Sequence, residues 1–203
     1  IADRFSQFTE GGMVNGYPKV YYLPSTQGVQ KFDPTYSLCW YFRLQQAFCE
    51  HFQKLSHYHF IIKVDPTTSW LSLPMANFLK DLGASNISYE EGDLIANLRK
   101  ADKVITDFPE APTYEARLMG LPVLSLYHES INVRPIAKQL YGKTIVSFKT
   151  AQEAIQHIAK FLSSEPEEYI VPMEDNFLCP SLVETLGKHK EKSAYKNRGI
   201  YAA

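Results

Sequence analysis

The sequence is poor in cysteine, balanced in charge and without a long apolar run. Its 203 residues include three cysteines, Cys39, Cys49 and Cys179, and none of them forms the CxxC pair of a zinc or redox site. This odd, widely spaced set excludes a disulfide framework and predicts reduced, buried thiols in a cytosolic protein. The 21 basic and 22 acidic side chains give a net charge of -1, so we expect no nucleic acid partner.

Several motifs of known binding and catalytic sites are also missing. No apolar run approaches the roughly 20 residues that span a bilayer, and the segment after Ile1 lacks the layout of a signal peptide. The absence of GxGxxG, P-loop and GxSxG motifs argues against a dinucleotide fingerprint, a P-loop NTPase and a serine hydrolase. No DxD-like pair or His/Cys cluster has metal-ligand spacing, so we expect neither a metal nor a redox cofactor.

Short strand-like runs alternate with helical patterns along the chain. The predicted strands cover residues 19–23, 59–64, 86–89, 103–107, 122–126 and 144–146. The predicted helices cover residues 35–55, 70–82, 93–100, 111–119, 131–140 and 151–162, and Gln45 occupies one position of the apolar stripe in the first of them. This alternation predicts an α/β fold with a doubly wound, Rossmann-like parallel sheet of about six strands.

The chain divides by pattern into three segments. We expect a turn-rich lead-in over residues 1–18, the Rossmann-like domain over 19–163 and a helical C-terminal extension over 164–203. The sequence begins with Ile rather than Met, which favours a piece of a longer protein.

Parallel sheets bind ligands beyond the carboxyl ends of their strands, so the residues after each strand are candidates for a site. Ser25, Thr26 and Gly28 follow the first strand and offer hydroxyls and backbone N–H groups to a phosphate, although an ordinary turn also explains them. Lys63 is a cation in the otherwise apolar second strand. It either faces an anionic ligand or pairs with Asp65.

The densest polar cluster follows the fourth strand. Thr113 lies near a helix start, where a hydroxyl and the helix dipole favour phosphate, and Glu115 can accept hydrogen bonds from ribose hydroxyls. Both also fit as plain capping groups. Asp107 and Glu110 form a carboxylate pair suited to acid–base chemistry, or belong to a proline-rich turn. His128 follows the fifth strand and either contacts a phosphate or sugar or is a loop histidine.

Residues 101–126 carry a resemblance to known enzymes. They read Ala-Asp-Lys-Val-Ile-Thr-Asp, then Thr-Tyr-Glu-Ala, then Gly-Leu-Pro-Val-Leu, and resemble the donor-binding half of GT-B glycosyltransferases. The same residues also resemble three related groups of enzymes: CDP-glycerol glycerophosphotransferases, capsule transferases and non-hydrolysing UDP-N-acetylglucosamine 2-epimerases. The resemblance implies that Thr113 contacts a nucleotide diphosphate, that Glu115 contacts its ribose and that Asp107 belongs to the same nucleotide site. Residues 61–66 look like a strand end of the capsule and glycerophosphotransferase branch, with Asp65 where that branch has histidine.

The resemblance implies the nucleotide-sugar-binding half of a bacterial glycosyltransferase for surface polysaccharide such as capsule. Its donor would be UDP- or CDP-linked, and a second, N-terminal half would bind the acceptor. We expect this chain alone to bind donor without transferring sugar, and the catalytic base is unassigned. The alternatives are a non-catalytic nucleotide-binding module or subunit and a sugar-nucleotide 2-epimerase-like domain. We expect a cytoplasmic protein, with the basic run 188–198 either a solvated helix end or a peripheral contact at the inner face of the membrane.

Overall fold

The structure, a computed structural model, describes residues 16–25, 38–64, 69–135, 138 and 141–171. The chain separates into two compact units, Ile1–Val171 and Pro172–Ala203, and every described residue belongs to the first. Most of the expected lead-in and of the expected helical extension lie outside the described residues, as do Thr26 and Gly28. The boundaries of the three expected segments therefore stay predictions.

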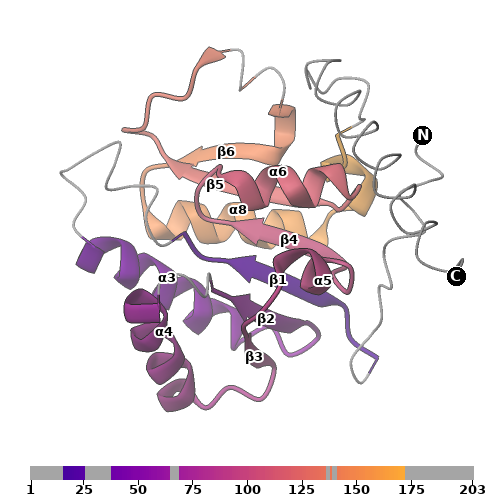
Figure 1. The fold of residues 1–203 in the computed structure, drawn as a ribbon. Helices are drawn as coiled ribbons and strands as arrows, with labels where there is room; N and C mark the ends of the chain where they lie inside the picture. Colours follow the sequence, from indigo (N-terminus) through magenta and orange to yellow (C-terminus); the bar gives the residue numbers. More distant parts are fainter. Residues whose placement is uncertain (1–15, 26–37, 65–68, 136–137, 139–140, 172–203) are drawn as a thin grey trace, which may run out of the picture. The chain divides into compact units, whose positions relative to one another are not determined.

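Six parallel strands form one sheet (Figure 1). They are β1 (Lys19–Leu23), β2 (His59–Lys63), β3 (Ile87–Glu90), β4 (Lys103–Thr106), β5 (Val123–His128) and β6 (Ile145–Phe148). Their order, β3-β2-β1-β4-β5-β6, confirms the expected doubly wound, Rossmann-like sheet. The chain runs outward from β1 to β3 and then returns to the other side of β1, where Leu23 pairs with Thr106 of β4. The strand order therefore reverses between β1 and β4.

The alternation of side chains along β1 supplies residues to a core on each face of the sheet. Val20 and Tyr22 pack with α3 (Leu38–Phe52), α4 (Ser69–Leu82) and α8 (Ala151–Ser163). Tyr21 and Leu23 pack with α5 (Leu94–Leu98) and α6 (Ala111–Leu118) on the other face. Because the central strands are buried on both faces, they appear in the sequence as nearly continuous apolar runs.

Aromatic rings fill the core beneath α3. Phe52 stacks on Phe60 with ring centroids 4.2 Å apart, and Tyr22 meets Phe48 and Phe52 edge-on at 5.9 and 5.6 Å. Each such pair adds about 0.5–1.5 kcal/mol beyond the burial of its area. Tyr22 carries a hydroxyl into this core, and a buried hydroxyl needs a hydrogen-bond partner.

Side-chain caps and glycines set the ends of several helices. Asp93 caps α5 by accepting a 2.7 Å hydrogen bond from the Ala96 N–H, and Thr150 caps α8 by accepting one from the Glu153 N–H at 3.2 Å. Gly120 follows α6 with a φ of +74°, a conformation that side chains other than glycine rarely adopt.

One expected helix begins later than its apolar pattern predicts. Residues 131–134 are not helical, and the described helical positions in this region are 135, 138 and 141. Pro135 explains the difference, because a proline fits the first turn of a helix and keeps the residue before it, Arg134, out of helical geometry. The described residues also form two 3₁₀ helices, η3 (Gly142–Thr144) and η4 (Pro166–Tyr169). Within the described residues, no helix has both the length and the apolar character to cross a membrane.

Candidate functional site

A cavity of about 540 Å³ opens where the strand order reverses. The last residues of β1, β2 and β4 form its wall, together with residues that follow β1, β3 and β4 and the first turns of α6. They are Leu23, Pro24, Ser25, Lys63, Gly92, Asp93, Leu94, Thr106, Phe108, Glu110, Ala111, Pro112 and Glu115. Doubly wound sheets bind their ligands at this position, outside the carboxyl ends of the strands.

The sequence-predicted residues divide between the cavity and its surroundings. Ser25, Lys63 and Glu115 line the cavity. Asp107 and Thr113 are buried behind its wall, with 1% of each residue exposed. His128, at the end of β5, is not among the lining residues.

Glu115 presents a partly desolvated carboxylate to the cavity. Burial and the nearby charge of Asp93 raise the pKa of Glu115. Asp93 also lines the cavity, and its Oδ1 is occupied by the N–H of Ala96. The sequence identified Asp93 only as the start of a helix, because its capping role gave no signal of a cavity wall. The two carboxylates together offer acceptors for hydroxyl donors on a ligand.

Lys63 brings a positive charge to the same wall. The residue is buried, and its Nζ donates a 2.9 Å hydrogen bond to the carbonyl of Val64. The alternative partner, Asp65, lies outside the described residues. An ammonium group carries three N–H donors and no acceptor, so it is suited to an anionic ligand.

Asp107 faces the interior, where four donors converge on it. Its carboxylate accepts hydrogen bonds from the Tyr22 hydroxyl at 2.5 Å, the Ser25 N–H at 2.6 Å and Gln45 Nε2 at 2.9 Å. The Tyr41 hydroxyl donates to its backbone carbonyl at 2.6 Å. Burial raises the pKa of Asp107 to about 6, against the lowering effect of these hydrogen bonds. Asp107 thus holds Ser25, which lies just beyond the end of β1.

The hydroxyl of Thr113 joins a buried polar cluster. It lies 2.9 Å from Thr106 Oγ1 and 3.4 Å from Ser125 Oγ, and it can donate to the Phe108 carbonyl at 3.3 Å. These contacts tie the first turns of α6 to β4 and β5. Thr106 is the member of this cluster that lines the cavity, while contact between Thr113 and a phosphate stays a prediction.

Ser25 differs from the open phosphate cradle that the sequence suggested after the first strand. Its N–H donates to Asp107, and its hydroxyl donates to the carboxylate of Glu110. Glu110 precedes α6 and makes no side-chain hydrogen bond to cap that helix. The Ser25 hydroxyl is therefore held by a cavity-lining carboxylate that a ligand oxygen can replace.

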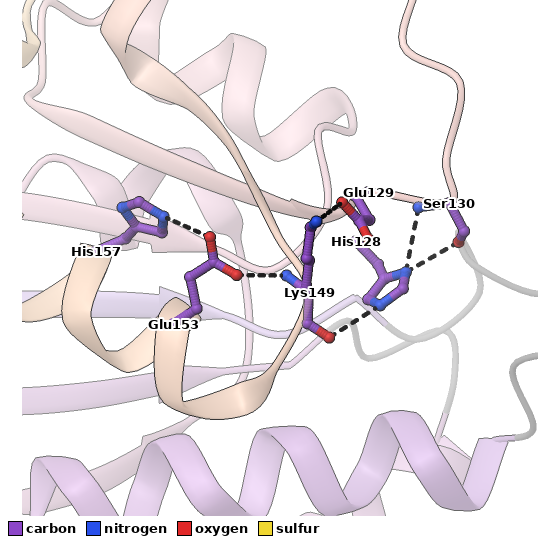
Figure 2. Close-up of polar contacts among 6 residues, drawn as sticks. All are labelled: His128, Glu129, Ser130, Lys149, Glu153 and His157. Atoms are coloured by element: carbon purple, nitrogen blue, oxygen red, sulfur yellow. Dashed lines mark hydrogen bonds and ion pairs between the residues drawn. The ribbon is translucent and has the colours of Figure 1, made fainter.

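His128 makes hydrogen bonds with Ser130 and Lys149 (Figure 2). Its Nδ1 accepts from the Ser130 N–H at 3.3 Å, so its Nε2, 3.2 Å from the Lys149 carbonyl, is the donor of that contact. Trp40 and Phe148 meet the imidazole edge-on at 5.5 and 5.6 Å. This arrangement anchors the end of β5 to the turn before α8, and a ligand contact by His128 stays a prediction.

The charges around the cavity are mostly negative. Asp93, Glu110 and Glu115 contribute carboxylates, and Lys63 contributes an ammonium group. Nowhere in the described part of the chain are three His, Cys, Asp or Glu side chains grouped to hold a metal ion. This lining suits a ligand that presents several hydroxyls and one anionic group.

No protein-family model and no curated protein matches the chain. Solved structures do resemble it. The structure of OtsA in its apo form has a TM-score of 0.53 at 10% identity, covering 84% of this chain and 43% of that one. A glycosyltransferase from Rickettsia africae ESF-5 has a TM-score of 0.48 at 16% identity, covering 72% and 38%. The catalytic domain of a cholesterol-alpha-glucosyltransferase from Helicobacter pylori has a TM-score of 0.46 at 13% identity, covering 74% and 89%.

The likeness to OtsA shows a shared fold. Its TM-score exceeds 0.5, while its 10% identity limits the conclusion to the fold. This chain spans less than half of the OtsA chain. The shared architecture agrees with the Rossmann-like fold expected from the alternation of strands and helices. The narrower likeness to the capsule and glycerophosphotransferase branch gains no support from these structures.

Proposed function

We propose that this chain binds the nucleotide-sugar donor of a glycosyltransferase in the cavity between the ends of β1 and β4. One observation carries the proposal. Ser25, Lys63 and Glu115, which the sequence places after the first strand, in the second strand and in the helix after the fourth, line a single cavity where the strand order reverses.

Glu115 is the proposed ribose contact. Its carboxylate lies in the wall from α6, and no hydrogen bond to it is found among the described residues. Two vicinal hydroxyls can donate to the two oxygens of one carboxylate, which is how acidic residues hold ribose in doubly wound folds. The raised pKa of Glu115 reflects partial desolvation, and a bound diol would restore hydrogen bonds to the ionised form.

The diphosphate of the donor is proposed to lie near the start of α6. Ala111 and Pro112, the first residues of that helix, line the cavity, so the positive end of the helix dipole faces it. Lys63 adds a full positive charge, and the Ser25 hydroxyl can exchange its bond to Glu110 for one to a phosphate oxygen. These groups would stabilise the charge that builds on a departing nucleoside diphosphate.

The wider setting of this site is also part of the proposal. We propose that a second, acceptor-binding half completes the enzyme, because the chain spans only 43% of OtsA, with which it shares its fold. A UDP- or CDP-linked donor and a role in bacterial surface polysaccharide rest on the resemblance of residues 61–66 and 101–126.

Calorimetric titration with UDP and CDP tests the proposal. Glu115→Gln keeps the shape of the side chain and removes its charge, so binding should weaken by about 1.5–3 kcal/mol, roughly tenfold or more. Glu50→Gln is the matched control, because Glu50 is exposed on α3 and does not line the cavity. Equal affinity of the wild-type protein and Glu115→Gln would remove Glu115 from the site. Failure of the wild-type protein to bind either nucleotide would contradict the proposal as a whole.

A further inference from the structure

We infer that Asp107 and Gln45 are positioning residues that hold Ser25 in the cavity wall and thereby set the affinity of the site for the diphosphate of its ligand. This inference rests on the proposed function and assigns a role to two side chains that do not themselves line the cavity. It concerns how the binding hydroxyl is oriented.

The three residues form a closed triangle of hydrogen bonds. The Ser25 N–H donates to Asp107 Oδ1 at 2.6 Å, and Gln45 Nε2 donates to the Ser25 carbonyl at 2.8 Å. The same Nε2 donates to Asp107 Oδ2 at 2.9 Å, which closes the triangle. All three residues are buried, with 8% of Ser25 and 6% of Gln45 exposed. Both backbone polar groups of Ser25 are therefore fixed by side chains.

Side chains hold both backbone polar groups of Ser25, which lies just beyond the end of β1. Turn backbones at a surface commonly satisfy their N–H and carbonyl groups with water, which leaves them mobile. Here the partners come from two other elements, because Gln45 belongs to α3 and Asp107 follows β4. Burying a carboxylate and an amide in an aromatic core is costly unless their hydrogen bonds are made. The buried side chains of Asp107 and Gln45 therefore both hold the backbone of Ser25, which lines the cavity.

The triangle determines which group of Ser25 can meet a ligand. Its N–H is taken by Asp107 and its carbonyl by Gln45, while its hydroxyl is directed to Glu110 on the cavity wall. A side chain that is held within a fraction of an ångström binds better than one that must be ordered on binding. The affinity for a diphosphate then depends on the triangle through the hydroxyl of Ser25.

Substitutions within the triangle test this role by titration with UDP and CDP. In Asp107→Asn, one amide oxygen cannot accept from three donors, so we expect binding about fivefold weaker or more. Tyr22→Phe is the matched control. It removes a different donor to Asp107 and leaves the Ser25 N–H contact in place, so we expect affinity within about twofold of wild type even if stability falls.

A double-mutant cycle with Ser25→Ala separates positioning from a general structural effect. If Asp107 acts through the Ser25 hydroxyl, Asp107→Asn should cause no further loss of affinity in the Ser25→Ala protein. Additive losses would overturn the inference. Gln45→Met serves where Asp107→Asn does not fold, since it removes the donor to the Ser25 carbonyl and should also weaken binding about fivefold.

The outcomes distinguish this inference from the proposed function. A wild-type protein that binds neither UDP nor CDP would overturn both. A wild-type protein that binds, with Asp107→Asn and Gln45→Met within about twofold of its affinity, would overturn the positioning role alone and leave the nucleotide site standing.

Discussion

At the scale of single residues, Asp107 links the stability of the fold to the site. Burial raises the pKa of its carboxyl to about 6, although Tyr22, Ser25 and Gln45 donate hydrogen bonds that favour the charged form. In the unfolded chain an aspartate titrates near about 4. The folded protein therefore binds this proton more tightly than the unfolded chain does.

The sign of the pH dependence follows from that difference. Between about pH 4 and pH 6, folding takes up a proton at Asp107. The contribution of this proton to the unfolding free energy is therefore greatest below about pH 4 and is lost as the pH rises through about 6. A shift of about two pKa units corresponds to about 3 kcal/mol of unfolding free energy. Urea unfolding of wild type and Asp107→Asn across this range measures the effect. The unfolding free energy of the variant should fall less steeply with rising pH, because the variant lacks the Asp107 carboxyl. Some fall should remain in both proteins, because the pKa of Glu115 is also raised. Parallel curves would contradict the assignment.

The two described cysteines should differ in reactivity. Burial raises the pKa of Cys49 to about 12, and the expectation of a buried thiol is confirmed there. The same expectation is wrong for Cys39, which is exposed. Because the thiolate is the reactive form, an aromatic disulfide reagent should label Cys39 in the native protein and Cys49 only on unfolding. Cys179→Ser removes the cysteine outside the described residues for this measurement. Labelling of Cys49 at the rate of Cys39 in the native state would show that the core opens readily.

The sequence predicted those site residues that lie next to the end of a strand or near the start of a helix. Ser25 and Lys63 adjoin strand ends and Glu115 follows a helix start, and the carboxyl ends of parallel strands meet at one edge of a sheet. Gln45 was not predicted as part of the site, because it occupies an apolar position of its helix and its partners are distant in sequence. The one sign of its role in the sequence was that Gln45 is a polar residue within the apolar stripe of its helix. Asp107 was predicted as a site residue because it follows β4, but it is buried behind the cavity wall, where it accepts a hydrogen bond from Ser25.

At the scale of elements, a buried lysine joins the start of β4 to the end of α8. Lys103 Nζ donates to the carbonyls of Phe161, Leu162 and Ser164 at 3.0, 2.8 and 2.8 Å. The last carbonyls of a helix lack intrahelical partners, and a cation there also complements the helix dipole. Lys103 therefore acts as the C-terminal cap of α8 from another element.

Removal of this cap should destabilise the fold. Lys103→Met keeps the apolar stem and removes a charged donor from all three carbonyls. The Phe161 carbonyl keeps the Ser164 N–H and the Leu162 carbonyl keeps the Tyr58 hydroxyl, whereas the Ser164 carbonyl loses this donor. The unfolding free energy should therefore fall by about 1.5–3 kcal/mol. Lys100→Met is the control, because Lys100 is exposed next to α5. Hydrogen exchange in the last turn of α8 should accelerate only in Lys103→Met. Equal unfolding free energies of the two variants would show that water replaces the lysine.

The central strands could be predicted well because they are short apolar runs buried on both faces, whereas the edge strands β3 and β6 are only partly buried. Helix starts were less predictable where two local signals compete. The apolar spacing favoured a helix from residue 131, but Pro135 delays it. The cavity depends on strand order, and order is set by long-range packing that no local pattern contains.

At the scale of the whole molecule, nucleotide binding should be independent of metal. The described residues hold no cluster of three metal-ligating side chains, and Lys63 with the start of α6 supplies positive charge. Affinities for UDP measured with EDTA, magnesium or manganese should agree within about twofold, a difference below about 0.5 kcal/mol. A large gain with metal would contradict this expectation and point first to Asp107 and Glu110, the carboxylates that follow β4.

The chain by itself should bind donor without transferring sugar. Transfer needs an acceptor held against the donor and a base to take its proton, and we assign both to the proposed second half. Nucleotide release from a UDP-sugar or CDP-sugar should stay at the background rate for this chain and rise when an acceptor-binding half is joined to it. Comparable turnover by this chain alone would indicate a self-sufficient enzyme.

A crystal structure of the chain with UDP or CDP tests the central claim most directly. The account predicts the nucleotide between the ends of β1 and β4, with its ribose hydroxyls hydrogen-bonded to Glu115 and its phosphates near Ser25, Lys63 and the start of α6. A nucleotide bound elsewhere on the protein, or one in the cavity whose ribose does not contact Glu115, would contradict it.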